Sequence, residues 1–184
     1  MARMRALKPF AWLLRRVWPA GSIEDSSGEA GEPIYDFRLA VERVAAAAEA
    51  THNSHFLLTA RAENFLCGRA DLHDTIRRLQ AFSEAGADVL YAPGLPSLDA
   101  IREVCASVPK PVNVVMGLKG ATYTVEDLGA AGVKRISVGG SLARAALGAL
   151  VRAAREIRDK GTFTFAEDAI SQADATAYMK DAEP

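Results

Sequence analysis

The segments GSIED (residues 21–25) and LLTARAEN (residues 57–64) each carry a short apolar run into charged residues. Such a run, bounded by polar residues, is typical of a strand buried in a parallel sheet. In parallel α/β proteins, ligands bind beyond the carboxyl ends of the strands. The two segments therefore predict a parallel sheet that presents Glu24, Arg61 and Glu63 at one rim.

The alternation of apolar runs and amphipathic stretches continues along the chain from residue 20. Strands are expected over residues 20–24, 55–60, 88–92, 111–116 and 134–138. Helices are expected over residues 36–51, 71–85, 97–107, 124–131 and 141–160, with a last helix over 165–179. Strands that alternate with helices of this length indicate βαβ units and an α/β fold. These five units form either an open sheet or part of an eight-stranded barrel, and periodicity alone does not choose.

The joints between these elements carry helix-end signals. Gly86 and Gly132 each follow a predicted helix, at the place where a left-handed residue ends it. Asp71 and Ser97 stand where a side chain can cap the next helix. Thr164 with Glu167 fits a capping box that opens the last helix.

The composition limits the class of protein. The chain has 184 residues, of which 49% are hydrophobic and 24% charged, with a net charge of −1. This suits one apolar core, and a charge near zero gives no reason to expect nucleic acid or an anionic membrane as partner. No apolar stretch is long enough to span a membrane. Cys67 and Cys105 are isolated in the sequence, which predicts reduced thiols and a cytoplasmic protein.

Residues 1–20 differ in composition from the remainder, because basic and aromatic residues alternate and no acidic residue precedes Glu24. A basic amphipathic segment can be a surface anchor or a transit peptide. It can also be a divergent first helix, or an artefactual start joined to a shortened domain. We favour the last two, since no linker separates the segment from the first predicted strand.

The motifs SIED, LTARAEN, EAGADVLYAPG, PVNVV and GVKRISVGGSLARAALGAL follow one another between residues 21 and 163. In this order they resemble the isocitrate lyase / phosphoenolpyruvate mutase family. The resemblance is narrower to its carboxyvinyl-carboxyphosphonate phosphorylmutase-like or 2-methylisocitrate lyase-like branch. It implies a (β/α)8 TIM-type barrel, here incomplete, with the fourth to eighth strands present and the first three absent. The implied domains are an atypical segment over 1–20, a partial barrel over 21–163, and a C-terminal helix and tail over 164–184.

The resemblance also implies an activity. Members of this family are Mg²⁺-dependent lyases or phosphonomutases that act on small keto or hydroxy carboxylic acids through an enolate. It implies a small carboxylate or phosphonate as substrate and a homo-oligomer, often formed by exchange of a C-terminal helix.

Carried over residue by residue, the resemblance gives a candidate site. Glu24 matches the acidic residue that helps to hold the metal through water, and a hard cation prefers such oxygens. Arg61 matches the arginine that grips the carboxylate or phosphoryl group of the substrate, for which a planar, permanently charged fork is suited. Glu63 falls at the acidic position two residues further on, and Asn113 takes the place of a family amide.

The last part of the implied site is a turn. Gly139 and Gly140 precede Ser141 where the eighth strand meets its helix, and free backbone N–H groups there could receive an anion.

Three departures from the family pattern leave the substrate and the general acid or base unassigned. The metal-binding aspartates of the earlier family strands have no counterpart in this sequence. The loop over residues 25–34 has no Cys, His or Lys, which argues against an isocitrate lyase reaction. Pro93 stands where methylisocitrate lyases have a glutamate.

Two other functions stay open at this point. One is a shortened, non-catalytic family member that acts only as an oligomer partner, because an opened barrel exposes strand edges that favour association. The other is an unrelated phosphate-binding βα module that uses only the turn at Gly139 and Gly140.

Overall fold

The computed structural model describes residues 20–180 except 53, 119 and 121. The chain divides into two compact units, one ending at Gly139 and the other beginning at Gly140, and each is described by itself. The predicted basic segment over 1–20 lies, except for Ala20, outside the described residues. The predicted division at residues 163 and 164 follows the family resemblance and stays a prediction.

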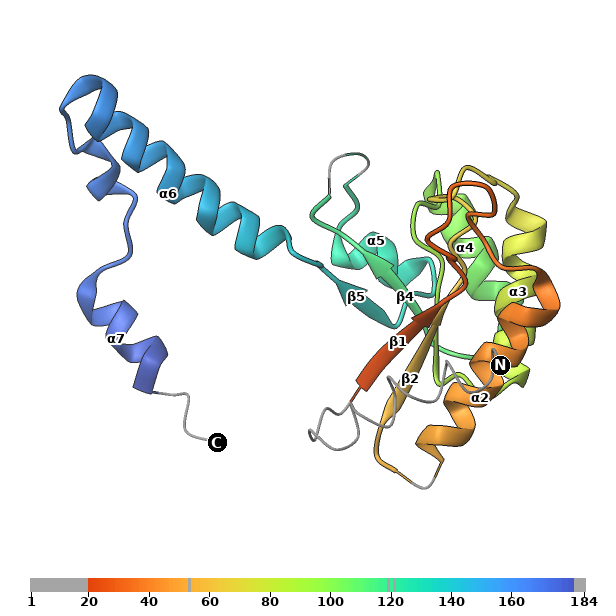
Figure 1. The fold of residues 1–184 in the computed structure, drawn as a ribbon. Helices are drawn as coiled ribbons and strands as arrows, with labels where there is room; N and C mark the ends of the chain where they lie inside the picture. The colour runs from red at the N-terminus through yellow and green to blue at the C-terminus, as the bar shows by residue number, and fades with distance from the viewer. Residues whose placement is uncertain (1–19, 53, 119, 121, 181–184) are drawn as a thin grey trace. The chain divides into compact units, whose positions relative to one another are not determined.

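The first unit is a sheet of five parallel strands with a helix after each of the first four (Figure 1). The strands are β1 (Ala20–Glu24), β2 (Leu57–Arg61), β3 (Val89–Tyr91), β4 (Val112–Val115) and β5 (Arg135–Ser137). The helices are α2 (Phe37–Thr51), α3 (Leu72–Glu84), α4 (Leu98–Ser107) and α5 (Val125–Ala130). Neighbours in the sheet are also neighbours in the chain, and the predicted strands and helices here are confirmed to within two residues.

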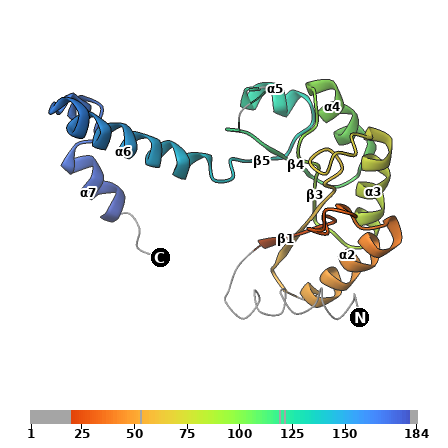
Figure 2. The same ribbon diagram turned by 45° about the horizontal axis from the view of Figure 1, so that its top comes forward.

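The core of this unit lies between the sheet and its helices, which line one face of the sheet (Figure 2). The strand register aligns Ile23, Ala60, Leu90 and Val112 across the sheet. Register partners in a parallel sheet point to the same face. All four are buried, in one cluster with Phe82 of α3. One face is therefore covered by helices, as on the outside of a (β/α)8 barrel, and the opposite face corresponds to the barrel interior.

The joints form as the sequence predicts. The side chains of Asp71 and Ser97 accept backbone N–H groups at the starts of α3 and α4. Gly86 has φ 105°, and a Cβ built there would lie 2.8 Å from the Ala48 Cβ of α2. Glycine at this position therefore satisfies both the left-handed turn and the close approach of α2.

The second unit comprises α6 (Ser141–Lys160), a 3₁₀ turn η1 (Thr164–Glu167) and α7 (Gln172–Lys180). The predicted last helix over 165–179 forms only in its second part, as α7, and its predicted start was wrong because residues 164–167 form the 3₁₀ turn η1. The Glu156 carboxylate accepts the Thr164 backbone N–H at 2.6 Å and its hydroxyl at 2.9 Å. Thr164 is thereby held on α6 and does not cap a helix. Ser171 takes that role for α7, where its hydroxyl oxygen accepts the N–H of Asp174 at 3.1 Å.

Helix α6 exposes apolar side chains. Leu142, Leu147 and Leu150 are each more than half exposed in the chain. The expected homo-oligomer is not tested by this single chain and stays a prediction. Among the described residues, no helix combines the length and apolar character needed to cross a membrane.

Candidate active site

One residue of each strand lies in a single line across the open face of the sheet. The register pairs Glu24 with Arg61, Arg61 with Tyr91, Tyr91 with Asn113, and Asn113 with Arg135. Laterally paired residues share a face, so all five side chains stand on the side opposite the helices. We call these five residues the polar row.

A pocket of about 240 Å³ lies against the polar row. It is lined by Arg61, Tyr91, Asn113 and Arg135 of the row. It is also lined by Thr59, two residues before Arg61 in β2, and by Ser137, two residues after Arg135 in β5. Because residues two apart in a strand share a face, the pocket is built from one side of the sheet. Its lining offers cations, amides and hydroxyls, which are groups that bind a small anion.

A larger cavity of about 320 Å³ lies beyond the ends of β3 and β4. It is lined mainly by apolar groups, among them Pro93, Leu95, Ile101 and Met116, and of the described residues that line it only Tyr123 has a titratable side chain. The smaller pocket therefore carries the chemistry that a reaction of acids needs.

Arg61 connects the acidic residues of the candidate site. Its Nε donates to the Glu63 Oε1 at 2.7 Å, and its Nη1 lies 3.4 Å from the Glu24 Oε2. Its guanidinium carbon also lies 5.0 Å from the centre of the Tyr91 ring, a cation–π contact. The structure thus brings together Glu24, Arg61 and Glu63, as the two sequence segments predict.

Burial alters the proton affinity of this group. It raises the pKa of Glu63, against the lowering effect of Arg61, and the charges of Glu24 and Asp25 add to the rise. Burial also raises the pKa of Tyr91. A carboxyl with raised proton affinity beside an arginine is a common feature of functional sites.

Asn113 lies in the same pocket as Arg61, as the resemblance implies, and is fully buried. Gly139 and Gly140 do not line this pocket; they lie at the boundary between the two units. Gly140 precedes α6 without a side-chain cap. The anion-binding role of this turn stays a prediction.

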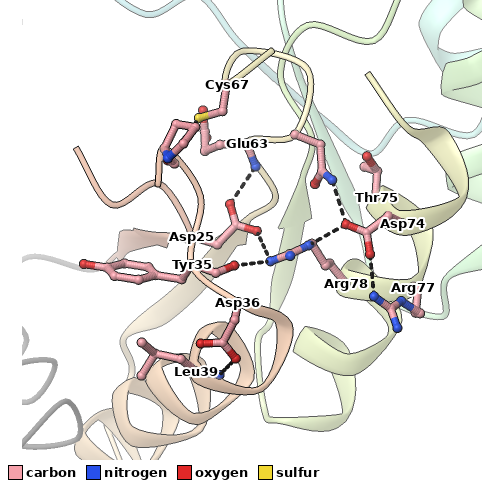
Figure 3. Close-up of polar contacts among 12 residues, drawn as sticks. Asp25, Tyr35, Asp36, Leu39, Glu63, Cys67, Asp74, Thr75, Arg77 and Arg78 are labelled. Carbon is pink, nitrogen blue, oxygen red and sulfur yellow. Dashed lines mark hydrogen bonds and ion pairs between the residues drawn. The ribbon is translucent and has the colours of Figure 1, made fainter. Parts of the chain in front are cut away.

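A buried ion pair beside the Glu63 backbone joins three segments (Figure 3). Arg78 of α3 donates from Nη1 to the Asp25 Oδ2 at 3.1 Å and to the Tyr35 carbonyl at 3.0 Å. Its Nε donates to the Asp74 Oδ2 at 2.8 Å. The Asp25 Oδ1 accepts the backbone N–H of Glu63 at 2.8 Å. Arg78 therefore fixes both ends of the loop after β1 and, through Asp25, the backbone beside Arg61.

Sequence reasoning missed Asp25 and Arg78. One signal was present, since Arg78 follows Thr75 by three residues and precedes Phe82 by four. These spacings place it on the buried face of a helix. Tyr91, Arg135 and Ser137 were also missed. The sequence of a short strand does not show which residues of the neighbouring strands will lie beside an isolated polar residue.

Asp25 and Asp74 respond differently to Arg78. Burial raises the pKa of Asp25, and the Glu63 N–H and Arg78 offset this only in part. Burial also acts to raise the pKa of Asp74, but hydrogen bonds from Arg78, Arg77 and Asn64 bring it down to about 2 from 3.8.

Asp74→Asn is expected to lower the free energy of unfolding at neutral pH but not at strongly acidic pH. Because the folded pKa of Asp74 lies below its ordinary value, its ionised form stabilises the fold by about 2 kcal/mol at neutral pH. That contribution is lost as pH falls from about 4 through about 2. Urea unfolding should show a gap between wild type and variant that is about 1 kcal/mol smaller at about pH 3 than at about pH 5. A difference in unfolding free energy that does not depend on pH would contradict this. The control is Asp99→Asn, which removes an exposed carboxylate from α4.

The carboxylates present fit Mg²⁺ only in part. No three His, Cys, Asp or Glu side chains gather into a metal-binding group within the described part of the chain. The Glu24 side chain is 48% exposed and can offer an oxygen on the open face. Because Mg²⁺ commonly keeps several waters and takes one or two carboxylates, Glu24 fits as a single protein ligand.

A parallel βα sheet with a polar, arginine-containing pocket on its open face defines an α/β protein suited to binding small acids. The family model described as phosphoenolpyruvate phosphomutase matches residues 13–158. The chain belongs to the phosphoenolpyruvate phosphomutase family, which confirms the predicted family and the α/β, TIM-barrel-type fold class.

Three relatives illustrate this membership. An uncharacterised protein of Mycobacterium tuberculosis is 35% identical over 141 residues, covering 75% of this chain and 51% of that protein. The 2-methylisocitrate lyase of Aeropyrum pernix is 32% identical over 111 residues, covering 56% of this chain and 36% of that enzyme. A solved structure from Burkholderia cenocepacia J2315, described as a candidate lyase/mutase, is 49% identical with a TM-score of 0.92 and covers 100% of this chain and 66% of that one. The chain spans about half the length of the first curated relatives that it matches.

Proposed function

We propose that this chain is a Mg²⁺-dependent lyase or phosphonomutase-type enzyme that acts on small keto or hydroxy carboxylic acids. Its family comprises lyases and mutases, which supports the reaction class. The observation that carries the proposal is the position of Arg61: it lines a polar pocket while two carboxylates hold its guanidinium.

Arg61 in the pocket and the two carboxylates that contact it suggest distinct tasks. Arg61 is 26% exposed, so its fork can bind a carboxylate or phosphonate group of the substrate. Glu63, almost wholly buried, orients that fork through the bond to Nε. Glu24 would hold Mg²⁺, which when bound polarises a keto oxygen and stabilises an enolate.

The proposal is tested by Mg²⁺-dependent turnover of phosphonopyruvate, oxaloacetate and 2-methylisocitrate. We expect at least one to be converted, and Mg²⁺ titrated by calorimetry to bind the wild-type chain. Glu24→Gln should lose most of both responses while its unfolding free energy changes by less than about 1 kcal/mol, because a half-exposed ion pair contributes little.

The control is Glu42→Gln, which removes an exposed carboxylate from an ion pair on α2. Absence of turnover and of Mg²⁺ binding in the wild-type chain would overturn the proposal. In that case, association of the chain would favour a non-catalytic oligomer partner. Phosphate binding at Gly139 and Gly140 without a Mg²⁺ response would favour a phosphate-binding module.

A further inference from the structure

Arg135 stands at the opposite end of the polar row from Glu24. The two arginines of the row differ in whether a carboxylate balances the charge of the guanidinium. Arg61 contacts two carboxylates. Within the described part of the chain, Arg135 forms no ion pair with a carboxylate. Its Nη1 donates instead to the neutral Oδ1 of Asn113 at 2.9 Å. A guanidinium that lines a pocket without a carboxylate partner can bind an anion there.

The contact with Arg135 also fixes the direction of neighbouring donors. Because the Asn113 Oδ1 accepts from Arg135, the orientation of the Asn113 amide is fixed. Its Nδ2 then donates to the Ser137 Oγ at 3.0 Å. The Ser137 hydroxyl, which accepts this bond, keeps its own proton to donate to a further acceptor. Arg135 and Ser137 therefore present two donors to the same pocket.

Arg61 and Arg135 both line the pocket, one toward each end of the polar row. Tyr91 and Asn113 separate the two arginines in the polar row. Adjacent strands lie about 4.8 Å apart, so three strand spacings separate the two arginine backbones by roughly 14 Å. Two long side chains can converge from that separation on a small acid above Tyr91. The charges of both arginines act to lower the pKa of Tyr91, against burial, which agrees with their convergence.

We infer that Arg135, with the Ser137 hydroxyl, forms a second anion-binding position in the pocket of Arg61. Arg135 then determines specificity, because the pocket retains small acids with two anionic groups and discriminates against acids with one. This inference rests on the proposed function, in which Arg61 binds the first anionic group.

Calorimetric binding of malonate and acetate, at low ionic strength and constant Mg²⁺, tests the inference on the full chain. We expect wild type to bind malonate at least about tenfold more tightly than acetate, since one further charge-assisted hydrogen bond is worth about that factor. Arg135→Gln should weaken malonate binding by about tenfold and change acetate binding by less than about twofold. Arg135→Lys, which keeps the charge, should restore part of the preference.

Two further variants separate the possible failures. Arg38→Gln, on an exposed part of α2, should leave both affinities unchanged. Ser137→Ala keeps the Arg135 contact with Asn113 and should weaken malonate binding without affecting acetate, so it tests the position even if Arg135→Gln does not fold. Equal effects of Arg135→Gln on both acids, or no effect on either, would overturn the inference while a loss caused by Arg61→Gln still supported the proposed function. Absence of any acid binding by wild type would overturn both.

Discussion

Arg78→Met is expected to lower the free energy of unfolding by about 3–5 kcal/mol at neutral pH, because it leaves a buried carboxylate without its partner. The Arg78 side chain is 4% exposed and the Asp25 side chain 1%. Methionine replaces the apolar stem of the arginine side chain but not its guanidinium, so the main loss is electrostatic. Asp25 would respond by taking up a proton, and the loss should therefore shrink as pH is lowered.

Urea unfolding followed by circular dichroism measures this effect. The matched control is Arg102→Met, which breaks an exposed ion pair on α4 and should cost less than about 1 kcal/mol. Arg78→Lys should be intermediate, since an ammonium keeps the charge but cannot reach Asp25, Asp74 and the Tyr35 carbonyl with one rigid fork. Equal losses for Arg78→Met and Arg102→Met would show that the buried pair does not hold the loop after β1.

Arg61→Gln is expected to weaken the binding of small carboxylates by about 100-fold, because it removes a pair of charge-assisted hydrogen bonds worth about 3 kcal/mol together. The same change leaves the buried Glu63 without its partner. Its pKa, already raised by burial, should rise further. The Glu63 carboxyl of the variant is therefore expected to hold its proton up to a higher pH than the same carboxyl of the wild-type chain.

Calorimetry with malonate gives the affinity, and NMR titration of the Glu63 carboxyl gives the pKa. Arg61→Lys serves as the conservative comparison and should lose less than Arg61→Gln, since it keeps the charge and loses the fork. If Arg61→Gln binds malonate as wild type does, the pocket does not use Arg61 and the proposed function loses its main support.

Most of the first unit could be predicted from the sequence. The βα units, the helix caps at Asp71 and Ser97 and the left-handed glycine at 86 each depend on a few neighbouring residues, which the sequence places side by side. The start of the last helix could not be predicted in the same way. Thr164 fits a capping box locally, but the Glu156 carboxylate, eight residues earlier, binds it first.

The candidate site was predictable only where one strand supplied it. The order Arg61 to Glu63 is written into a single segment at the end of β2, so the two residues are near neighbours in the chain whatever the register of the sheet. Their meeting with Glu24 followed from the rule that parallel strands end at the same rim. Arg135 carried no such signal, because a β-strand pattern fixes which residues share a face but not which residues of other strands lie beside them.

The sequence by itself determined the order and approximate bounds of the elements of the first unit and the pair of arginine and acidic segments, since these depend on local propensity and on a periodicity of two or 3.6 residues. Only the tertiary structure decided the polar row and the burial of Arg78. The register of the strands is set by packing of their opposite face, where Ile23, Ala60 and Leu90 align beneath the helices. That packing, made by residues far apart in the chain, brings Glu24 and Arg135 to one face and encloses the charge of Arg78 away from water.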